Sequence, residues 1–197
     1  MKRNVLAAAV VLMFVCGVVW ADVVVTLPKI DVNQGDVGWG YCYVQNDGTA
    51  PNLGSFDIEF ELSPPQGGGS GVTFTDAAKP EIDSGDHPYI LESGDAWYDE
   101  YDADYVYGSD IDTLATPVGD PIDDGDGFVK FQYTVASDAT MGKWPLTFSL
   151  VELYDTDGKE LTSEQTGWIN VVPEPGSLTL LAVGLLGLIF FGWWRKR

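Results

Sequence analysis

The stretch Ser55–Leu62, SFDIEFEL, alternates between apolar and acidic residues at every step. Successive side chains of a β-strand point to opposite faces of the sheet, so this pattern predicts a strand with one face on a core and the other in water. The apolar face would hold Phe56, Ile58, Phe60 and Leu62, and the solvent face Asp57, Glu59 and Glu61.

Similar alternation recurs outward from this stretch, and no segment between the terminal regions shows a long helical stripe. Clusters of Gly, Pro, Asn and Asp separate the candidate strands. Because each strand offers one apolar face, a second sheet must cover it, which predicts an all-β, jelly-roll-like β-sandwich. The expected strands are Val23–Leu27, Gly38–Gln45, Ser55–Leu62, Phe128–Val135, Trp144–Val151 and Thr166–Val171.

The N-terminal residues 1–21 have the order of a secretory signal peptide. Met1–Asn4 is basic, Val5–Val19 is apolar, and small residues stand at the −3 and −1 positions of a cleavage site before residue 22. A lipoprotein attached at Cys16 is the alternative, although the residues before it form a poor lipobox. We therefore expect an N-terminal signal helix over 1–21 and an exported ectodomain over 22–172.

The C-terminal residues 173–197, PEPGSLTLLAVGLLGLIFFGWWRKR, contain an uncharged run of 18 residues, Ser177–Trp194. As a helix this run would span about 27 Å, close to the hydrocarbon thickness of a bilayer. The cations at its end favour the cytoplasmic side of the membrane. The sequence thus predicts a transmembrane helix over 177–194 that holds the chain in the inner membrane.

The tail has three parts in order: Pro173-Glu174-Pro175, the uncharged run, and the terminal Arg195-Lys196-Arg197. This order resembles the PEP-CTERM sorting signal. The resemblance implies export by a Gram-negative-type bacterium, recognition and cleavage by an exosortase, and a destination at the cell envelope, the outer surface or the extracellular biofilm matrix. A permanent single-pass anchor is the alternative. The residues that carry the motif are Val172, Pro173, Glu174, Pro175, Arg195, Lys196 and Arg197.

The ectodomain is strongly acidic. The chain has 30 acidic and 10 basic residues, and five of the basic residues but only Glu174 among the acids lie in the terminal segments. Residues 22–172 therefore hold 29 acids against five lysines, a net charge of −24. This charge excludes nucleic acid as a natural partner and suits solubility, divalent cations or basic partners.

The ectodomain also resembles the cohesins. The similarity rests on VVVTLPKIDVNQGDVGWGYCYVQN at the start, on Leu53–Phe60, and on the segments Gly142–Phe148 and Val151–Gly158 near the end. It implies a jelly-roll sandwich and a dockerin-bearing partner. The long acidic stretch 76–126 departs from the pattern, and we expect that it could cover the face a partner would use.

Clustered carboxylates make calcium a candidate ligand. Carboxylates crowded on a turn repel each other unless solvated or neutralised, and calcium binds oxygen ligands in flexible loops of this composition. A solvated loop is the alternative for this group. Asp155–Gly158 has the spacing that opens an EF-hand loop, but the following residues do not continue it, so we predict a hairpin turn there. The candidate calcium ligands are Asp120, Asp123, Asp124 and Asp126.

Aromatic residues interleave with acids between residues 97 and 107. Trp97, Tyr101 and Tyr105 are candidate ligand-binding residues that could stack on sugars beside carboxylates accepting hydroxyl protons. The alternative is that these rings only cover the edge of the sandwich.

The sequence gives little support to catalysis. The ectodomain has one histidine, His87, and neither HExxH nor GxSxG occurs. Cys42 lies in an alternating strand and is expected to be a buried thiol. Paired carboxylates leave a glycan-active enzyme as a remote alternative. We expect a non-catalytic sandwich for structural or adhesive binding of extracellular polysaccharide or protein, with a cohesin-type adaptor as the first alternative.

Overall fold

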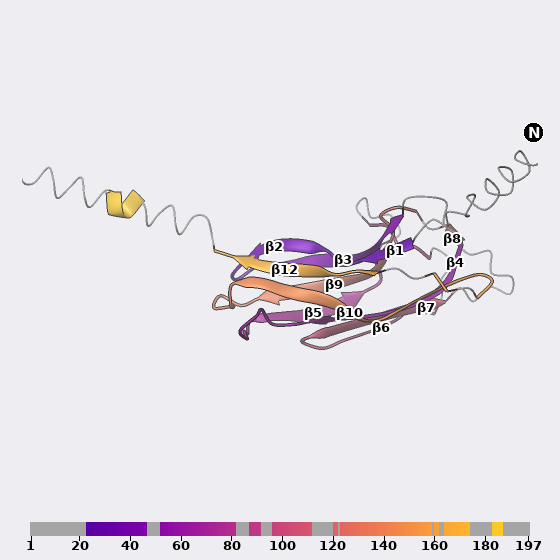
Figure 1. The fold of residues 1–197 in the computed structure, drawn as a ribbon, viewed down its shortest axis with the longest axis horizontal. Helices are drawn as coiled ribbons and strands as arrows, with labels where there is room; N and C mark the ends of the chain where they lie inside the picture. The colour runs from indigo at the N-terminus through magenta and orange to yellow at the C-terminus, as the bar shows by residue number, and fades with distance from the viewer. Residues whose placement is uncertain are drawn as a thin grey trace, which may run out of the picture.

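The computed structural model describes residues 23–46, 52–81, 87–91, 96–111, 120–121, 123–158, 160–161, 164–173 and 183–186. Its strands form two layers (Figure 1). They are β1 (Val23–Thr26), β2 (Lys29–Asn33), β3 (Val37–Asn46), β4 (Asn52–Leu62), β5 (Val72–Ala78), β6 (Tyr98–Tyr101), β7 (Tyr105–Ile111), β8 (Asp120–Pro121), β9 (Gly127–Val135), β10 (Gly142–Asp155), β11 (Glu164–Gln165) and β12 (Gly167–Val172).

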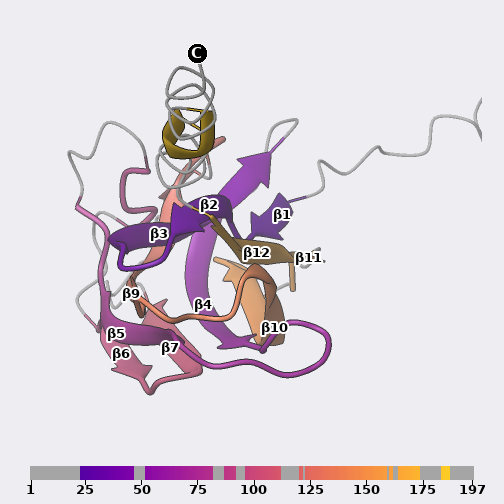
Figure 2. The same cartoon turned by 90° about the vertical axis from the view of Figure 1, so that its left-hand side faces the viewer.

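The two layers are a five-stranded sheet in the order β11-β1-β3-β9-β5 and a seven-stranded sheet in the order β2-β12-β10-β4-β7-β6, with β8 paired to β4. Most neighbours are antiparallel, whereas β1–β11 and β2–β12 are parallel. Figure 2 looks along the sandwich and shows the seven-stranded sheet curving, so that β6 and β7 approach β5. The predicted all-β sandwich is confirmed.

Aromatic side chains from both sheets meet in the core. The ring centroids of Phe56 on β4 and Phe128 on β9 are 5.0 Å apart, and those of Phe60 and Phe131 are 5.1 Å apart, both edge to face. Phe74 on β5 packs against both Phe60 and Phe131. Edge-to-face pairs at these distances add to the stabilisation from burial alone. The inward positions predicted from the alternation of β4 are thus confirmed.

The N-terminal strands β1 and β2 pair with the C-terminal strands β11 and β12. Between β1 and β2 the chain crosses from the five-stranded to the seven-stranded sheet, and the amide of Trp168 donates to the Pro28 carbonyl at 3.0 Å. A Cβ at Gly167 would lie 2.2 Å from the same carbonyl oxygen, so this crossing requires glycine. Because β12 lies between β2 and β10, the residue that leads into the C-terminal segment is fixed inside a sheet.

Each of the six expected strands is present, with shifted ends, and the hairpin turn expected at Asp155–Gly158 is also confirmed: the Gly158 amide donates to the Asp155 carbonyl at 2.9 Å. The strands β2, β5, β6, β7, β8 and β11 were not predicted. The inward positions of β7 include Gly108 and Asp110, which give no apolar signal. In the described part of the acidic stretch, β6 and β7 extend the edge of the seven-stranded sheet. The expectation that this stretch covers the face a partner would use stays a prediction.

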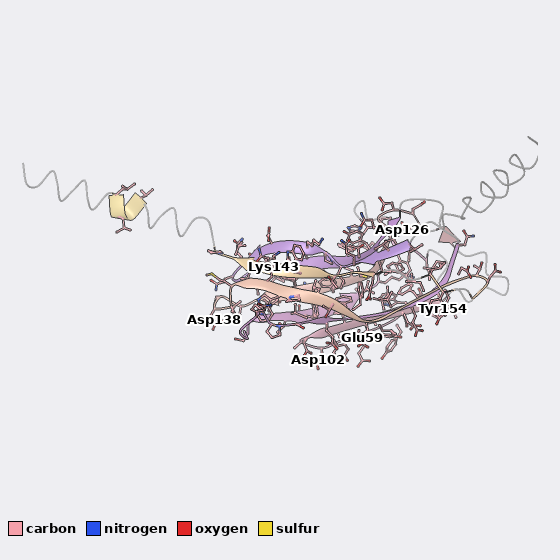
Figure 3. The ribbon with its side chains drawn as sticks, viewed as in Figure 1. Glu59, Asp102, Asp126, Asp138, Lys143 and Tyr154 are labelled. Atoms are coloured by element: carbon pink, nitrogen blue, oxygen red, sulfur yellow. The ribbon has the colours of Figure 1, made fainter. Side chains whose placement is uncertain are left out.

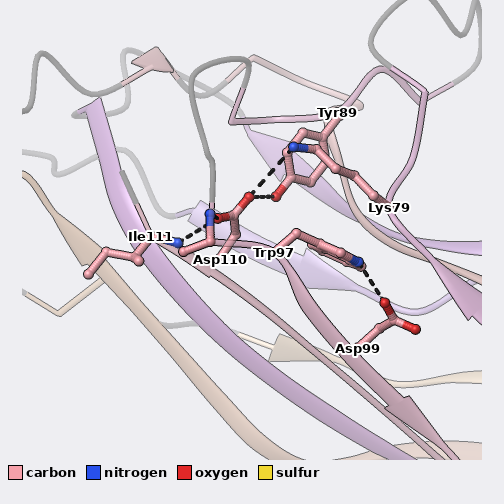
Figure 4. Close-up of polar contacts among 7 residues, drawn as sticks. Lys79, Tyr89, Trp97, Asp99, Asp110 and Ile111 are labelled. Carbon is pink, nitrogen blue, oxygen red and sulfur yellow. Dashed lines mark hydrogen bonds and ion pairs between the residues drawn. The ribbon is translucent and has the colours of Figure 1, made fainter. Parts of the chain in front are cut away.

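A buried polar cluster fastens the connection between β5 and β6 to β7 (Figure 4). The Asp110 side chain is buried and accepts a short hydrogen bond from the Tyr89 hydroxyl and further bonds from the amides of Ala96 at 3.2 Å and Ile111 at 2.8 Å. Lys79 Nζ lies 3.7 Å from Asp110 Oδ2 and 4.1 Å from the centre of the Tyr89 ring. This Asp110 cluster neutralises a buried carboxylate, as burial of a charge requires.

The predicted signal peptide and most of the predicted transmembrane helix lie outside the described residues. Val183–Leu186 form one helical turn. Within the described part of the chain, no helix has the length and apolar character needed to cross a membrane.

Candidate binding face

The outward side of β10, β4, β7 and β6 presents carboxylates and tyrosines in alternating rows. Antiparallel pairing sets Glu59 opposite Tyr107, Glu61 opposite Tyr105 and Glu100 opposite Tyr107 from the other side. Figure 3 labels Glu59 and Tyr154 on this side of the sandwich. We call this surface the carboxylate–tyrosine face. Its members are Asp57, Glu59, Glu61, Tyr98, Glu100, Tyr105, Tyr107, Glu152 and Tyr154.

Tyrosine hydroxyls on this face donate to neighbouring carboxylates. Glu100 accepts from Tyr105 at 2.7 Å and from Tyr98 at 3.2 Å. Tyr107 donates to Asp57 at 2.6 Å across the β4–β7 pair. These bonds to charged acceptors are strong and fix the positions of both partners.

A bulge in β10 adds a further donor. The register between β10 and β4 shifts between Phe148 and Leu150, and the Ser149 hydroxyl donates to Glu59 Oε1 at 2.6 Å. Further along β10, Tyr154 donates to Glu152 at 3.2 Å. The carboxylates are therefore preorganised by hydroxyl groups and do not depend on lysines for their orientation.

The tyrosines of this face remain protonated donors at neutral pH. Hydrogen bonding to Glu100 raises the pKa of Tyr105 to about 12 and also raises the pKa of Tyr98. Burial, followed by the bond to Asp57, raises the pKa of Tyr107, and the bond to Glu152 raises that of Tyr154. Every shift is upward, because a neighbouring carboxylate and, for Tyr107 above all, burial disfavour the tyrosinate anion.

The face contains a shallow hollow of about 470 Å³. The loop that joins β6 to β7 borders it through Asp104. The residues that line it are Glu59, Glu61, Glu100, Asp104, Tyr105 and Tyr107. A lysine or arginine side chain placed here would meet carboxylates from three elements at once.

The three aromatic residues predicted to bind a ligand do not lie on one surface. Trp97 packs toward the core, with its ring centre 5.7 Å from that of Tyr89 and its Nε1 donating to Asp99 at 2.7 Å. Tyr101 is 44% exposed at the edge strand. Tyr105 alone lines the hollow. The shared sugar-stacking role therefore stays a prediction without a common surface, and Trp97 packs against the sandwich edge.

The predicted calcium loop leads into β9, beside β3. The Asp123 amide donates to Asp126 Oδ2 at 2.8 Å, and the Asp126 carbonyl accepts from the Val44 amide at 2.8 Å. Asp120 pairs through its backbone with Leu53, and its side chain lies outside the described part. Among described side chains, no group of three or more acidic, histidine or cysteine residues is placed to hold a metal ion. Calcium binding by Asp120, Asp123, Asp124 and Asp126 stays a prediction.

Of the sorting-motif residues, Val172 ends β12 opposite Asn33, and Pro173 follows it, exposed. Glu174, Pro175 and the terminal Arg195, Lys196 and Arg197 lie outside the described residues. Cys42 is fully buried, as expected, and this burial raises the pKa of its thiol.

Comparisons with known proteins agree with these features. The model of the PEP-CTERM protein-sorting motif matches residues 171–196, and no curated protein matches the chain. Similar solved structures are cohesins. A non-cellulosomal cohesin from Archaeoglobus fulgidus has 14% identity and a TM-score of 0.57 over 81% of this chain and 97% of its own. The cohesin CaCohA2 from Clostridium acetobutylicum has 17% identity and a TM-score of 0.56 over 77% and 91%.

A third neighbour is the Coh-OlpA–Doc918 cohesin–dockerin complex from Clostridium thermocellum, with 14% identity and a TM-score of 0.56 over 78% of this chain and 99% of the matched chain. Fold and motif together define an exported β-sandwich protein with a cohesin-like fold. In particular, the chain carries a PEP-CTERM sorting motif, which marks it for exosortase processing and for the cell envelope of a Gram-negative-type bacterium.

Proposed function

We propose that this chain is an exosortase-sorted surface protein whose sandwich is a non-catalytic binding module, and that it binds a partner protein through the carboxylate–tyrosine face. The observation that carries the proposal is the open outward side of β10, β4, β7 and β6. Five carboxylates, Asp57, Glu59, Glu61, Glu100 and Glu152, lie there among tyrosines.

The chemistry of the face indicates the kind of partner. Of the lysines that the structure describes, none lies on β4, β6 or β7, and Lys143 near the start of β10 packs over the Trp168 ring of β12 at 3.8 Å. No described lysine is therefore paired with the carboxylates of this face. A partner with lysine or arginine side chains would supply complementary charge, which speeds association and sets orientation. Tyrosine side chains are enriched at protein interfaces, since they combine a large apolar area with a polar end.

A dockerin-type module is the first partner to test. Two structural neighbours, the CaDoc0917–CaCohA2 complex and the Coh-OlpA–Doc918 complex, are complexes of a cohesin with a dockerin. At 16% and 14% identity these neighbours support the shared fold, and transfer of their partner class to this chain is our proposal. On this basis the protein would be an adaptor at the cell surface that retains a second exported protein.

Reversal of charge on the face should weaken partner binding. The variant Glu59→Lys/Glu61→Lys places two cations among the remaining carboxylates, and we expect affinity for the partner to fall about 10- to 100-fold, as for mutation of interface charges. The assay is capture from the envelope fraction by the immobilised full chain in mild detergent, followed by titration of the captured protein.

The matched control is Asp138→Lys/Glu164→Lys, which makes the same change in net charge at exposed positions outside the face. It should retain binding. Equal binding by wild type, face variant and control would overturn the proposal, and so would a loss that is equal in the two variants.

Removal of residues 173–197 should release the protein into the medium, because the sorting motif and the predicted membrane segment are lost together. In the full chain, Pro173→Ala/Pro175→Ala should instead yield an unprocessed form of higher mass in the inner membrane. Fractionation with intact-mass measurement distinguishes the two. A permanent anchor predicts that the Pro variant matches the wild type in mass and location.

A further inference from the structure

The outward side of the other sheet carries a row of aromatic residues on β3. Trp39, Tyr41 and Tyr43 occupy every second position, while Cys42 and Val44 between and beyond them are buried. Residues two apart on a strand are about 6.6 Å apart and point the same way, so the three rings form one line. Trp39 is 39% exposed although it is a large aromatic residue.

Side chains from neighbouring segments extend this row sideways. Lys130 on β9 lies with its Nζ 4.6 Å from the centre of the Trp39 ring. The imidazole of His87 stacks on Tyr43 at 4.5 Å and 24°, and approaches Tyr41 at 5.2 Å. These contacts join the three rings of β3 with Lys130 and His87 into one platform, in which Lys130 lies over Trp39 and His87 stacks on Tyr43.

Amide and hydroxyl side chains surround the platform. Gln132 on β9 is paired with Trp39. The Thr75 hydroxyl donates to the Oε1 atom of Gln132 at 3.0 Å. At the far end of the row, a hollow of about 400 Å³ lies where β1, β3 and β11 meet. It is lined by Thr26, Leu27, Lys29, Tyr43, Gln45 and Gln165.

The Thr26 hydroxyl beside this hollow is a second, independent observation. Thr26 is 4% exposed, and among the described side chains its Oγ1 is buried without a hydrogen-bond partner. A buried hydroxyl without a hydrogen-bond partner raises the free energy of the folded state. A ligand in the hollow that hydrogen-bonds to this hydroxyl would remove that cost.

We infer that this aromatic strip, formed by Trp39, Tyr41, Tyr43 and the hollow beyond them, binds a neutral polysaccharide. The C–H face of a pyranose ring packs on aromatic rings, and its hydroxyls hydrogen-bond to amides such as those of Gln45 and Gln165. The outward side chains of β3 and β9 include one charge, Lys130, which lies 3.7 Å from Glu81, and Lys29 lines the hollow. A polyanion would be repelled by the acidic body of the protein, and a polycation would be drawn to the carboxylates of the other sheet.

Affinity electrophoresis tests this inference. The full chain in mild detergent is run through native gels that contain hydroxyethyl cellulose, xylan, galactomannan or, as an anionic polymer, alginate. We expect retardation by at least one neutral polymer and not by alginate. Trp39→Ala should weaken that retardation at least tenfold, whereas Met141→Ala, an exposed position outside both proposed surfaces, should leave it unchanged.

A second variant protects the test against misfolding. Gln45→Ala/Gln165→Ala removes two exposed amides at the hollow and leaves the aromatic packing intact. If Trp39→Ala loses the far-ultraviolet circular dichroism signal of the folded sandwich, the retardation of the Gln45→Ala/Gln165→Ala variant is the test of the inference. The inference is overturned if no neutral polymer retards the wild type, if alginate retards it more strongly, or if the strip variants migrate like the wild type. Binding of a protein to the strip in place of a polysaccharide would overturn it as well.

Discussion

Phe60→Ala is expected to lower the free energy of unfolding by about 3–5 kcal/mol, the range for removal of a fully buried phenylalanine. Phe60 is completely buried at the centre of the core, and its ring meets those of Phe131 at 5.1 Å, Phe74 at 5.8 Å and Phe148 at 6.4 Å. The substitution removes contacts to both sheets and leaves a cavity that strands fixed by pairing on both sides cannot fill.

Urea denaturation followed by tryptophan fluorescence measures this loss. Met141→Ala, at a position that is half exposed outside the strands, is the control and should change the stability by less than about 0.5 kcal/mol. A loss below about 1 kcal/mol for Phe60→Ala would mean that the core is not packed as the structure has it.

Asp110→Ala should cost about 3 kcal/mol, because it removes the acceptor on which the Asp110 cluster depends. The Tyr89 hydroxyl and the Ala96 amide would lose their bonds, and Lys79 would lose its counter-ion. We expect the segments that contain Tyr89 and Ala96 to open first, which hydrogen exchange of their amides would detect. Asp110→Asn keeps an acceptor for these donors and should be less destabilising than Asp110→Ala.

The cluster also predicts a direction of pH dependence. Burial first, and then the hydrogen bond and charge of Asp110, raise the pKa of Tyr89 above its ordinary value of 10. A pKa that is higher in the folded state contributes stability below the unfolded value of 10, and this contribution disappears as the pH rises through the folded value. For the Asp110→Ala variant itself, a free energy of unfolding at pH 7 equal to that of the wild type would contradict the role given to the cluster.

The fold was predictable where apolar residues occupy every inward position. Ser55–Leu62 shows this pattern, and the structure buries Phe56, Ile58, Phe60 and Leu62. The prediction failed where the inward side of a strand carries residues that are not apolar. On β7 the inward Gly108 makes room for Val129, whose Cγ2 would lie 2.5 Å from a Cβ at that position, and the inward Asp110 is satisfied by polar partners.

The candidate site was only half predictable for a related reason. Alternation placed Asp57, Glu59 and Glu61 in solvent correctly. Their pairing with Tyr105 and Tyr107 depends on which strand lies beside β4, and strand order is a property of the whole chain. Trp97 was grouped with Tyr101 and Tyr105 by closeness in sequence, but it precedes β6 and packs against the core instead.

The two proposed surfaces lie on opposite sheets, so one module could hold a protein partner and a polysaccharide together. The carboxylate–tyrosine face is preorganised by hydroxyl donors, whereas the rings of the aromatic strip are carried by β3, which pairs with β9. Substitutions on one sheet should leave binding on the other unchanged, because a rigid core separates them. A PEP-CTERM motif beginning at residue 171, inside β12, places this module directly beside the sorting signal.

Equilibrium binding of the captured partner, measured across a series of salt concentrations, is the experiment to make first. If the carboxylates of β4 and β6 hold a cationic partner, affinity should fall steadily as salt rises, and Glu59→Lys/Glu61→Lys should lower the affinity about 10- to 100-fold and reduce its salt dependence. An affinity that is indifferent to salt and unchanged by that variant would show that the partner binds elsewhere on the sandwich.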